Sequence, residues 1–389
     1  MLFDEIVKSS YSGPEYPVLG AFSREWAFSR PFEGLRVLAA TPVFRNTLLQ
    51  YRALLAGGAN LVVGIAGSGK DCAGADAAGA AMPCDLGIVD VLRENGIPVI
   101  GVQEALEMEA RCADSGDSAF DLILDCAGQF SACHPRFGFV ELTRSGVQFY
   151  ENCEHPVYVA DSGIVKRIET CLGTGEGYVR ALAQLGHDFD DGKKFVVFGS
   201  GKVGQGIVLQ LLRSGANVQV VTDCSRGSNA FLDANGVPVT DCNDLDGVAA
   251  LVRDADFVVT ATGVKGALDR PQIVEALLAS DAVLANMGVE DEYGPGVPAT
   301  RVLAEKKPLN FILEEPTHLK YIDASLALHA ALGELLLQEA AGVSSQESAS
   351  AANKKAGPLD PPSELEQRIL SMTMQDGLIG PEIAEMLGW

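Results

Sequence analysis

The chain has 389 residues, of which 47% are hydrophobic and 21% charged, a balance typical of a globular protein that folds in water. Its formal net charge of −23 would repel nucleic-acid phosphates, so we expect a small-molecule substrate and no nucleic acid as a partner. No apolar run is long enough to span a bilayer, and the first residues lack the basic and apolar parts of a signal peptide. We therefore expect a cytoplasmic protein without a membrane partner.

The nine cysteines follow neither a disulfide framework nor the paired spacing of a zinc site. An odd number of scattered cysteines is typical of proteins in a reducing compartment. The sequence therefore predicts reduced thiols and no metal site.

The first half of the chain alternates strand-like and helix-like segments. Short apolar, β-branched runs predict strands, and the longer amphipathic stretches between them predict helices. Strands separated by helices of this length indicate a parallel, doubly wound sheet and an α/β fold. The expected strands are residues 37–40, 61–65, 98–102, 121–125 and 157–161, and the expected helices are residues 47–55, 75–95 and 164–185.

The second half repeats this alternation, with strands expected from Phe195, Val218, Phe257 and Ala282. A last strand at residues 309–313 and a long helix at residues 318–340 complete the globular part. The composition then becomes polar and small, which predicts a linker at residues 343–362. Periodicity returns at residues 363–389, where we expect a helical tail of one or two short helices.

The segment KFVVFGSGKVGQGIVLQLLRSGANVQVVTD carries the clearest functional signal. Gly199 permits a tight turn from strand to helix, Gly201 lets backbone amides approach a pyrophosphate, and Gly204 allows close helix packing. Asp223, 19 residues after Gly204, is placed to bind the hydroxyls of a ribose. This carboxylate would repel a 2′-phosphate, so we expect NAD as the cofactor; Arg226 leaves NADP open.

Further motifs occur in the order EYPVL, SRPFEGLRVLAA, LILDCAGQ, ELTRSGVQFY, VYVADSGIVKRIETCLGTGEG, GSGKVGQG, FVVTATG, LANMG and PLNF. In their order and spacing they resemble the S-adenosylhomocysteine hydrolase family. The resemblance implies two doubly wound domains and a C-terminal tail. Residues 1–190 and 317–342 would form a split substrate domain, and residues 191–316 a Rossmann NAD-binding domain. It also implies a hinge between these domains and a homo-oligomer, either a dimer or a tetramer.

The cofactor-binding half of this resemblance is well preserved. It implies that threonines at a strand end and two asparagines contact the dinucleotide, with Asn310 near the carboxamide and Thr143 reaching over from the substrate domain. The implied cofactor residues are Gly199, Gly201, Lys202, Val203, Gly204, Asp223, Thr143, Thr260, Thr262, Gly263, Asn286 and Asn310.

The proton-transfer half of the resemblance is largely lost. The family's catalytic histidine falls on Pro42, the lysine that handles the 3′-hydroxyl proton on Val165, and the second acid of a pair on Cys126. The C-terminal lysine and tyrosine that reach into the neighbouring protomer have no counterpart. These losses imply a changed reaction. Other family positions are replaced by Leu142, Glu169, Thr170 and Val289.

Several residues remain as candidates for chemistry, each with a plainer alternative such as a solvated helix face or a buried structural thiol. The catalytic candidates are His318, Lys166, Asp125 and Cys126, and the substrate-binding candidates are Lys70, Asp71, Arg144 and Asp161. Lys70 completes a GxxxxGK pattern, but an aspartate follows where a P-loop needs serine or threonine, which argues against a nucleoside triphosphatase.

These observations predict an NAD-dependent enzyme that oxidises, permanently or transiently, a hydroxyl of a small molecule. Arg144 would suit a substrate that carries a carboxylate. Two alternatives stay open. The protein could hydrolyse S-adenosylhomocysteine with relocated proton shuttles, or it could be a non-catalytic NAD-binding regulator or partner subunit.

Overall fold

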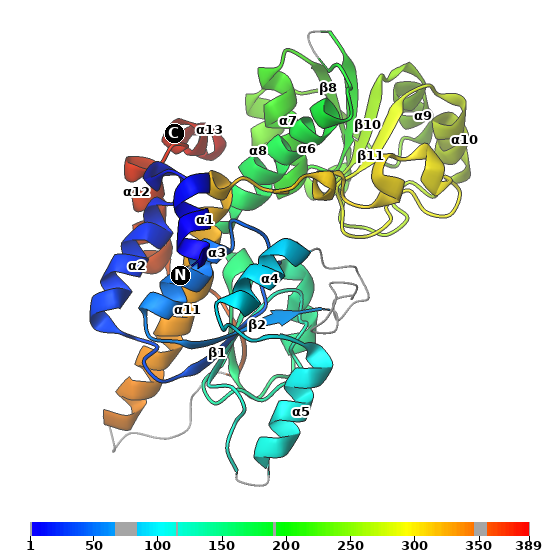
Figure 1. The fold of residues 1–389 in the computed structure, drawn as a ribbon. Coiled ribbons are helices and arrows are strands. Elements are labelled where there is room, and N and C mark those ends of the chain that lie inside the picture. Colours follow the sequence, from blue (N-terminus) through cyan, green and yellow to red (C-terminus); the bar gives the residue numbers. More distant parts are fainter. Residues whose placement is uncertain (1, 67–83, 114–115, 190–191, 346–355, 389) are drawn as a thin grey trace. The chain divides into compact units, whose positions relative to one another are not determined.

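The computed structural model describes residues 2–66, 84–113, 116–189, 192–345 and 356–388. Two compact units emerge (Figure 1). The split unit contains Met1–Ile168 and Leu319–Trp389, and the central unit contains Glu169–His318. The central unit thus starts earlier than residue 191, because α6 (Thr174–Gln184) packs against α7 (Lys202–Arg213).

The split unit is built on a seven-stranded sheet with the order β12-β6-β5-β4-β1-β2-β3, and every pairing is parallel. The strands expected in the first half of the sequence are confirmed, and two short strands, β5 and β12, were missed. The strand bounds are β1 (Arg36–Ala39), β2 (Asn60–Ile65), β3 (Val99–Gly101), β4 (Leu122–Asp125), β5 (Gly138–Glu141), β6 (Pro156–Val159) and β12 (Gly357–Leu359).

The helices of the split unit alternate with these strands and add an N-terminal pair. The expected helix at residues 75–95 is described only as α4, because residues 67–83 lie outside the described residues. The bounds are α1 (Leu2–Ser10), α2 (Pro17–Ser29), α3 (Leu48–Ala56), α4 (Leu86–Glu94), α5 (Val102–Ala113), α11 (Leu319–Ser345), α12 (Ser363–Asp376) and α13 (Gly380–Leu387).

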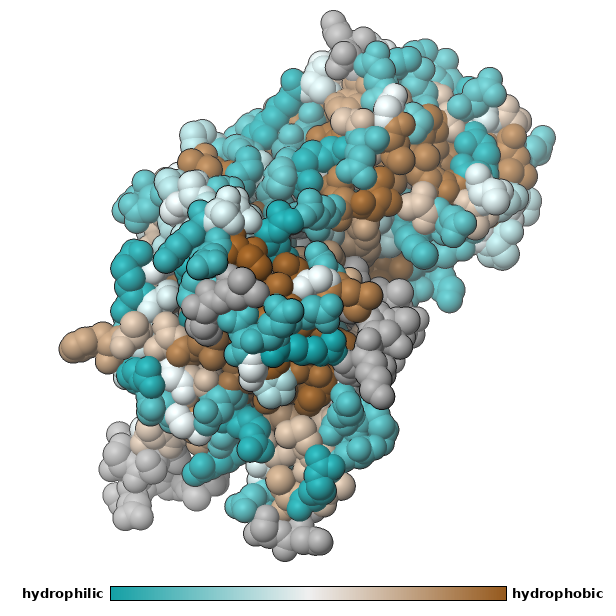
Figure 2. All heavy atoms as spheres, viewed as in Figure 1, coloured by the Kyte–Doolittle hydropathy of each residue, from teal (hydrophilic) through white to brown (hydrophobic). Residues whose placement is uncertain are grey.

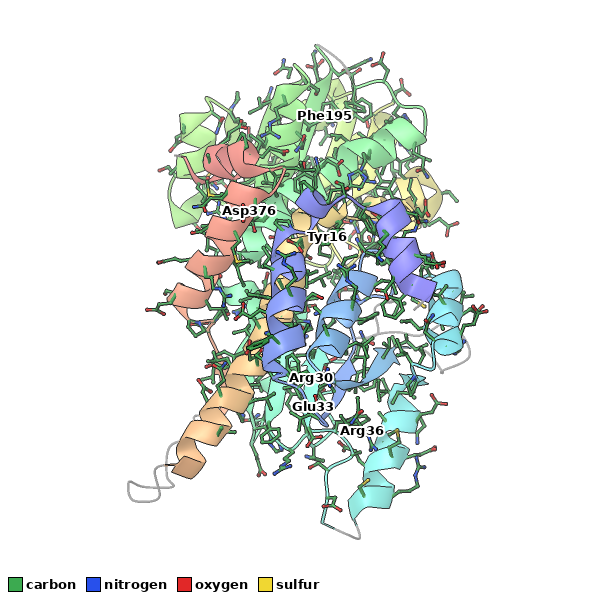
Figure 3. The ribbon with its side chains drawn as sticks, turned by 60° about the vertical axis from the view of Figure 1, so that its left-hand side comes forward. Tyr16, Arg30, Glu33, Arg36, Phe195 and Asp376 are labelled. Carbon is green, nitrogen blue, oxygen red and sulfur yellow. The ribbon has the colours of Figure 1, made fainter. Side chains whose placement is uncertain are left out.

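Helix α2 begins without a side-chain cap of its own, and α11 supplies one from far along the chain. Both oxygens of the buried Asp323 carboxylate accept backbone N–H groups at the start of α2, from Val18 at 2.9 Å and Leu19 at 3.1 Å. At its other end, α2 closes with Arg30 in the left-handed region, and Arg30 pairs with Glu33 (Figure 3). The cap ties the N-terminal helices to α11.

The segment expected to be a linker takes part in the fold. Strand β12 pairs in parallel with β6 at the sheet edge, so residues 343–362 are only partly a linker. Its residues had looked too small and polar for a strand, but pairing with an existing edge supplies the backbone hydrogen bonds that the composition does not reveal. The expected tail helices α12 and α13 are confirmed, and the Glu366 carboxylate of α12 accepts the Val165 N–H at 3.1 Å.

The central unit has a five-stranded parallel sheet with the order β11-β10-β7-β8-β9. Renumbered from β7, this is the strand order of a Rossmann domain, which confirms the predicted fold. The strand bounds are β7 (Lys194–Phe198), β8 (Asn217–Thr222), β9 (Val239–Asp241), β10 (Phe257–Thr260) and β11 (Val283–Asn286), and the remaining helices are α8 (Ala230–Ala234), α9 (Leu245–Asp254) and α10 (Pro271–Ala279).

Aromatic stacking and close glycine contacts hold the central unit together. Phe195 and Phe257 stack on neighbouring strands with ring centroids 4.4 Å apart. A Cβ added at Gly175 would lie 2.3 Å from the Gly206 carbonyl oxygen, so glycine is what allows α6 to approach α7 this closely. Figure 2 shows hydrophobic residues gathered on the visible face of this unit, and its exposed hydrophobics include Val264 and Val289.

Two expectations are wrong. The segment expected as a strand at residues 309–313 contains a 3-10 helix, Leu309–Ile312. Leu309 and Leu313 pack into the core while Phe311 is exposed, which suits a helical turn and not a strand, where all three would share a face.

The other wrong expectation concerns the cysteines. Cys84 is disulfide-bonded, whereas other described cysteines carry free thiols. Proximity in the fold decides which thiols can pair, and sequence spacing did not reveal it. Among the described residues, no helix combines the length and the apolar character needed to cross a bilayer.

Candidate functional site

A cavity of about 1010 Å³ opens at the carboxyl ends of β7, β8 and β10 in the central unit. The strand order reverses between β7 and β10, and ligands of open α/β sheets bind at such a point. Its lining includes four of the predicted cofactor residues, namely Gly199, Gly201, Asp223 and Thr262.

The three glycines of the turn between β7 and α7 meet different requirements. Gly199 has a φ of +105°, and a Cβ there would lie 2.3 Å from the Ala261 carbonyl oxygen. A Cβ at Gly204 would lie 2.1 Å from the Gly199 carbonyl oxygen, so these two glycines are needed by the protein itself. A Cβ at Gly201 would have no described atom within 4 Å, which leaves open space at the start of α7. An anion such as a pyrophosphate would suit that space, because the first turn of a helix favours negative charge. Lys202 and Val203 form the first turn of α7.

The end of β8 places a carboxylate on the cavity wall. Asp223 follows the last residue of β8, and its side chain accepts the Ser225 N–H at 3.0 Å. The hydroxyls of Ser200 and Thr222 lie 2.9 Å apart and join the glycine turn to the end of β8. The sequence-predicted ribose ligand is therefore held in place by its own loop.

At the end of β10, a buried carboxylate that sequence reasoning missed organises the loop. The Glu292 carboxylate accepts hydrogen bonds from the Thr262 N–H and hydroxyl, each at 2.8 Å, and from the Gly263 N–H at 2.7 Å. Burial raises the pKa of Glu292, and these hydrogen bonds oppose the shift. The hydroxyl of Thr262 and the amide of Gly263 are thus already engaged. The only sequence signal was an acidic residue shortly after the β11 motif.

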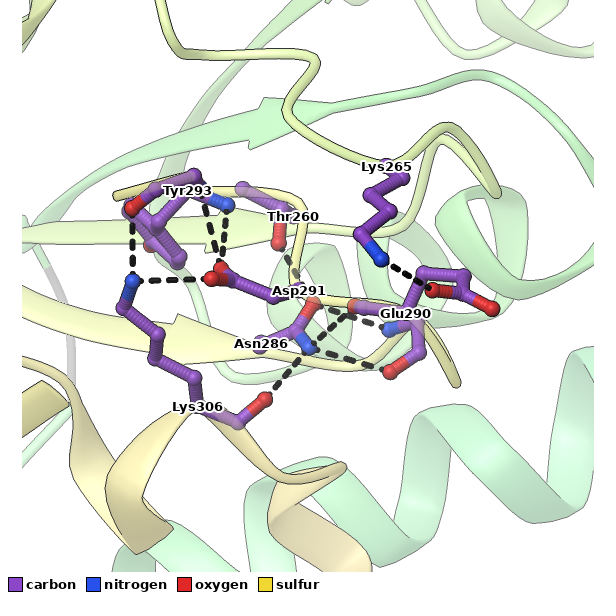
Figure 4. A network of polar contacts seen from close by, with 9 residues as sticks. Thr260, Lys265, Asn286, Glu290, Asp291, Tyr293 and Lys306 are labelled. Atoms are coloured by element: carbon purple, nitrogen blue, oxygen red, sulfur yellow. Dashed lines mark hydrogen bonds and ion pairs between the residues drawn. The ribbon is translucent and has the colours of Figure 1, made fainter. Parts of the chain in front are cut away.

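Thr260 and Asn286 form the support beneath this loop (Figure 4). The Thr260 hydroxyl donates to Asn286 Oδ1 at 2.8 Å, and both side chains are buried. The Asn286 amide donates to the carbonyls of Gly288, Glu290 and Lys306. Both were predicted to contact the cofactor, and that contact stays a prediction; in the structure their polar side-chain groups bind one another and nearby carbonyls.

A second polar cluster lies beside Asn310. His318 Nδ1 lies 3.0 Å from Glu176 Oε1, and Arg180 Nε lies 2.7 Å from Glu176 Oε2. Burial alone would raise the pKa of Glu176, but hydrogen bonds with His318 and Arg180 outweigh burial and lower this pKa. Burial raises the pKa of the neighbouring Glu315 to about 7, and His318 opposes this shift. The cluster therefore combines an imidazole with two carboxyl groups of different proton affinity.

The cluster and Asn310 share one piece of backbone. A Cβ at Gly177, the residue after Glu176, would lie 3.2 Å from Asn310 Cβ and 2.6 Å from the Pro316 carbonyl oxygen. The Asn310 amide donates to that same carbonyl at 3.5 Å. His318 is thus placed near the asparagine that the family resemblance assigns to the carboxamide.

In the split unit, the predicted Asp125 pairs with a carboxyl group that was not predicted. Asp125 and Glu141 are register partners at the ends of β4 and β5, and both are fully buried. Burial, and then the charge of Glu141, raise the pKa of Asp125 to about 8. Asp125 Oδ2 accepts hydrogen bonds from the Tyr150 hydroxyl, at 2.5 Å, and from the Phe130 N–H. Cys126 is buried, and its N–H donates to Asp125 Oδ1 at 2.8 Å.

The other predicted residues of the split unit differ in their burial and contacts. The Thr143 hydroxyl donates to Glu141 Oε1 at 2.7 Å. Lys166 is only 2% exposed, so a solvated helix face does not describe it. Arg144 is exposed and Asp161 is half-buried. Lys70 and Asp71 lie outside the described residues.

Comparisons with known proteins agree with this geometry. Residues 187–288 match a family model whose description reads "Putative NAD(P)-binding", which confirms the predicted dinucleotide-binding domain. Adenosylhomocysteinase of Thermoplasma acidophilum is 27% identical over 306 residues, covering 72% of this chain and 68% of the relative. Adenosylhomocysteinase of Archaeoglobus fulgidus is 26% identical over 355 residues, covering 80% and 82%.

Two further matches are partial in length or low in identity. The chain spans 64% of the adenosylhomocysteinase of Sulfurisphaera tokodaii, at 26% identity over 70% of its own length. Among solved structures, one component of the dipicolinate synthase of Bacillus halodurans matches with a TM-score of 0.45 and 16% identity, covering 79% of this chain and 99% of the other. The resemblance predicted from the motifs is confirmed: the chain is similar to the adenosylhomocysteinases over most of its length, and it contains an NAD(P)-binding domain.

Proposed function

We propose that the protein is an NAD-dependent enzyme that oxidises a hydroxyl of a small molecule. The single observation that carries this proposal is the cavity at the switch point of the central sheet, whose wall is open at Gly201 and carries the Asp223 carboxylate. Curated relatives named adenosylhomocysteinase support an enzyme of this group.

In this proposal the chain binds the dinucleotide through its backbone and one acid. The first amides of α7 bind the pyrophosphate beside Gly201, and Asp223 accepts hydrogen bonds from the ribose hydroxyls. A 2′-phosphate would meet the Asp223 charge, so NAD is preferred to NADP. Bound nicotinamide supplies a hydride acceptor.

His318 moves the proton in this proposal. Glu176, kept ionised by its partners, accepts a hydrogen bond from the Nδ1–H of His318, which leaves Nε2 as the acceptor for the proton of a substrate hydroxyl. Hydroxyl oxidation releases one proton together with the hydride, and the imidazole receives that proton. This assigns base chemistry to His318, because the family's own histidine and lysine positions hold Pro42 and Val165.

Absorbance of reduced nicotinamide tests the proposal. The purified protein, loaded with NAD⁺, would be mixed in turn with adenosine, S-adenosylhomocysteine, other nucleosides and small hydroxy acids. We expect reduction by at least one of these compounds, lost in His318→Asn while NADH binding is retained. Thiol release from S-adenosylhomocysteine would instead establish the hydrolase reaction.

The same experiment addresses a non-catalytic role. Two observations support this alternative: Asp125, predicted to be catalytic, is buried, and the hydroxyl of Thr143, predicted to bind the cofactor, donates to Glu141. Under it, bound NAD⁺ stays oxidised with every compound while NADH still binds. Such a result would contradict the proposed oxidation.

A further inference from the structure

Two cysteines stand at the ends of neighbouring strands on the wall of the dinucleotide cavity. Cys224 comes two residues after β8, and Cys242 comes directly after β9. Both carry free thiols, Cys224 is exposed and Cys242 is half-buried. Both line the cavity that also contains Asp223.

A shared carbonyl brings the two cysteines together. The Cys224 thiol donates to the Thr222 carbonyl oxygen at 3.8 Å, and the Cys242 N–H donates to the same oxygen at 2.8 Å. Thr222 and Asp241 are register partners in parallel strands. Cys224 follows this register pair by two residues and Cys242 by one, so both cysteines lie at the same end of neighbouring strands. A disulfide requires Cα atoms about 4.4–6.8 Å apart, a range compatible with neighbours on adjacent strands, which lie about 4.7–4.9 Å apart.

We propose that Cys224 and Cys242 are a reversible thiol modification site, and that a disulfide between them closes the ribose end of the cavity and prevents dinucleotide binding. The effect on binding rests on the proposed dinucleotide site, whereas the disulfide itself does not.

A low-molecular-weight disulfide is the oxidant. The exposed Cys224 sulfur attacks one sulfur of the reagent, which forms a mixed disulfide and releases the first thiol. The Cys242 sulfur then attacks Cys224 Sγ, forms the internal S–S bond and releases the second thiol. The two protons lost by the cysteines end on the two released thiols. Both cysteines are oxidised and the reagent is reduced.

The surroundings make this exchange slow near neutral pH. Loss of some hydration, then the Asp241 and Asp223 carboxylates, raise the pKa of the exposed Cys224 thiol. Burial and Asp241 also raise the pKa of Cys242, with Arg270 opposing the shift. Only thiolates attack disulfides, so the pair stays reduced unless the oxidant persists. Asp223 is thus the predicted ribose ligand and also slows thiol–disulfide exchange, because its charge disfavours the thiolates.

Glutathione disulfide is the probe that tests the proposal. The reduced full-length protein would be incubated with it, digested without reduction and mapped by mass spectrometry, while NADH affinity is measured before and after. We expect a peptide cross-linked through Cys224 and Cys242, a loss of NADH affinity of about tenfold or more, and recovery of both with dithiothreitol.

For each variant, the affinity ratio is the NADH affinity before oxidation divided by that after oxidation. Cys224→Ser should show an affinity ratio near one, and Cys242→Ser should keep the glutathione adduct on Cys224 without forming the internal cross-link. Cys153→Ser, which removes a thiol of the split unit, should respond like the wild type. A glutathione adduct without the internal cross-link, or a cross-link that leaves NADH affinity unchanged, would overturn the proposal. If the reduced protein binds no dinucleotide, the cofactor assignment fails, but the cross-link still tests the thiol pair.

Discussion

Glu176 Oε1 lies 3.0 Å from His318 Nδ1, within a cluster that also contains Arg180 and Glu315. The two residues come from opposite ends of the central unit's sequence, and their hydrogen bond fixes the orientation of an imidazole beside Asn310. In an orientation of this kind, the far nitrogen of the ring is free to accept a proton.

Glu176→Gln should lower substrate-dependent reduction of NAD⁺ by about 10²-fold, because a neutral amide no longer stabilises the charged imidazole. NADH affinity should stay within about twofold of the wild type, since Glu176 does not line the dinucleotide cavity. Stopped-flow absorbance and NADH fluorescence measure the two quantities. Glu275→Gln, an equal charge change at an exposed position, is the control. Unchanged turnover in Glu176→Gln would remove His318 from the reaction.

Glu315 should make the free energy of unfolding depend on pH near neutrality. Its folded pKa, about 7, lies above the ordinary value, so the folded state holds a proton that the unfolded chain releases. The resulting stabilisation is full below the unfolded pKa and disappears as pH rises through about 7. Glu315→Gln should therefore gain stability relative to the wild type as pH rises from 5 to 8, by on the order of 1 kcal/mol after solvent screening. Denaturant unfolding at both pH values measures this, and equal differences at the two values would contradict the assignment.

Gly201 and Gly204 should respond differently to the same added methyl group. Gly201→Ala places its Cβ in open space, so we expect normal stability but weaker NADH binding, by about tenfold or more. Gly204→Ala forces its Cβ against the Gly199 carbonyl and should cost about 1–3 kcal/mol of stability. Thermal unfolding and NADH titration of both variants separate the two effects. Equal stability losses would mean that the turn is packed differently.

Asp323→Ala should destabilise the split unit by about 2–4 kcal/mol, because it leaves the buried N–H groups of Val18 and Leu19 without an acceptor. Urea unfolding measures the change. Asp376→Ala, at the exposed end of α12 (Figure 3), should change stability by less than about 0.5 kcal/mol. A small effect at Asp323 would show that α2 does not depend on this cap.

Local patterns predicted most strands and the dinucleotide turn, because buried parallel strands and glycine turns leave signatures within a few residues. The contacts made by Glu292, Glu141 and Asp323 could not be predicted in the same way. Each is a buried carboxylate with at least two donors from more distant parts of the sequence, and an isolated acid in a sequence is usually exposed.

Strand β12 and the 3-10 turn at Leu309 were not predicted from the sequence for a related reason. Pairing with the β6 edge and packing of Leu309 and Leu313 into the core are decided by tertiary structure, which overrides weak local preferences.

NADH titration of the reduced, full-length protein tests the central claim most directly. Fluorescence enhancement should saturate at one NADH per chain, NAD⁺ should compete, and NADPH should bind at least about tenfold more weakly because of Asp223. Asp223→Ser should narrow that difference, while Asp281→Asn, an exposed control, should not. If neither NADH nor NADPH binds, the cavity in the central unit is not a dinucleotide site and the account is contradicted.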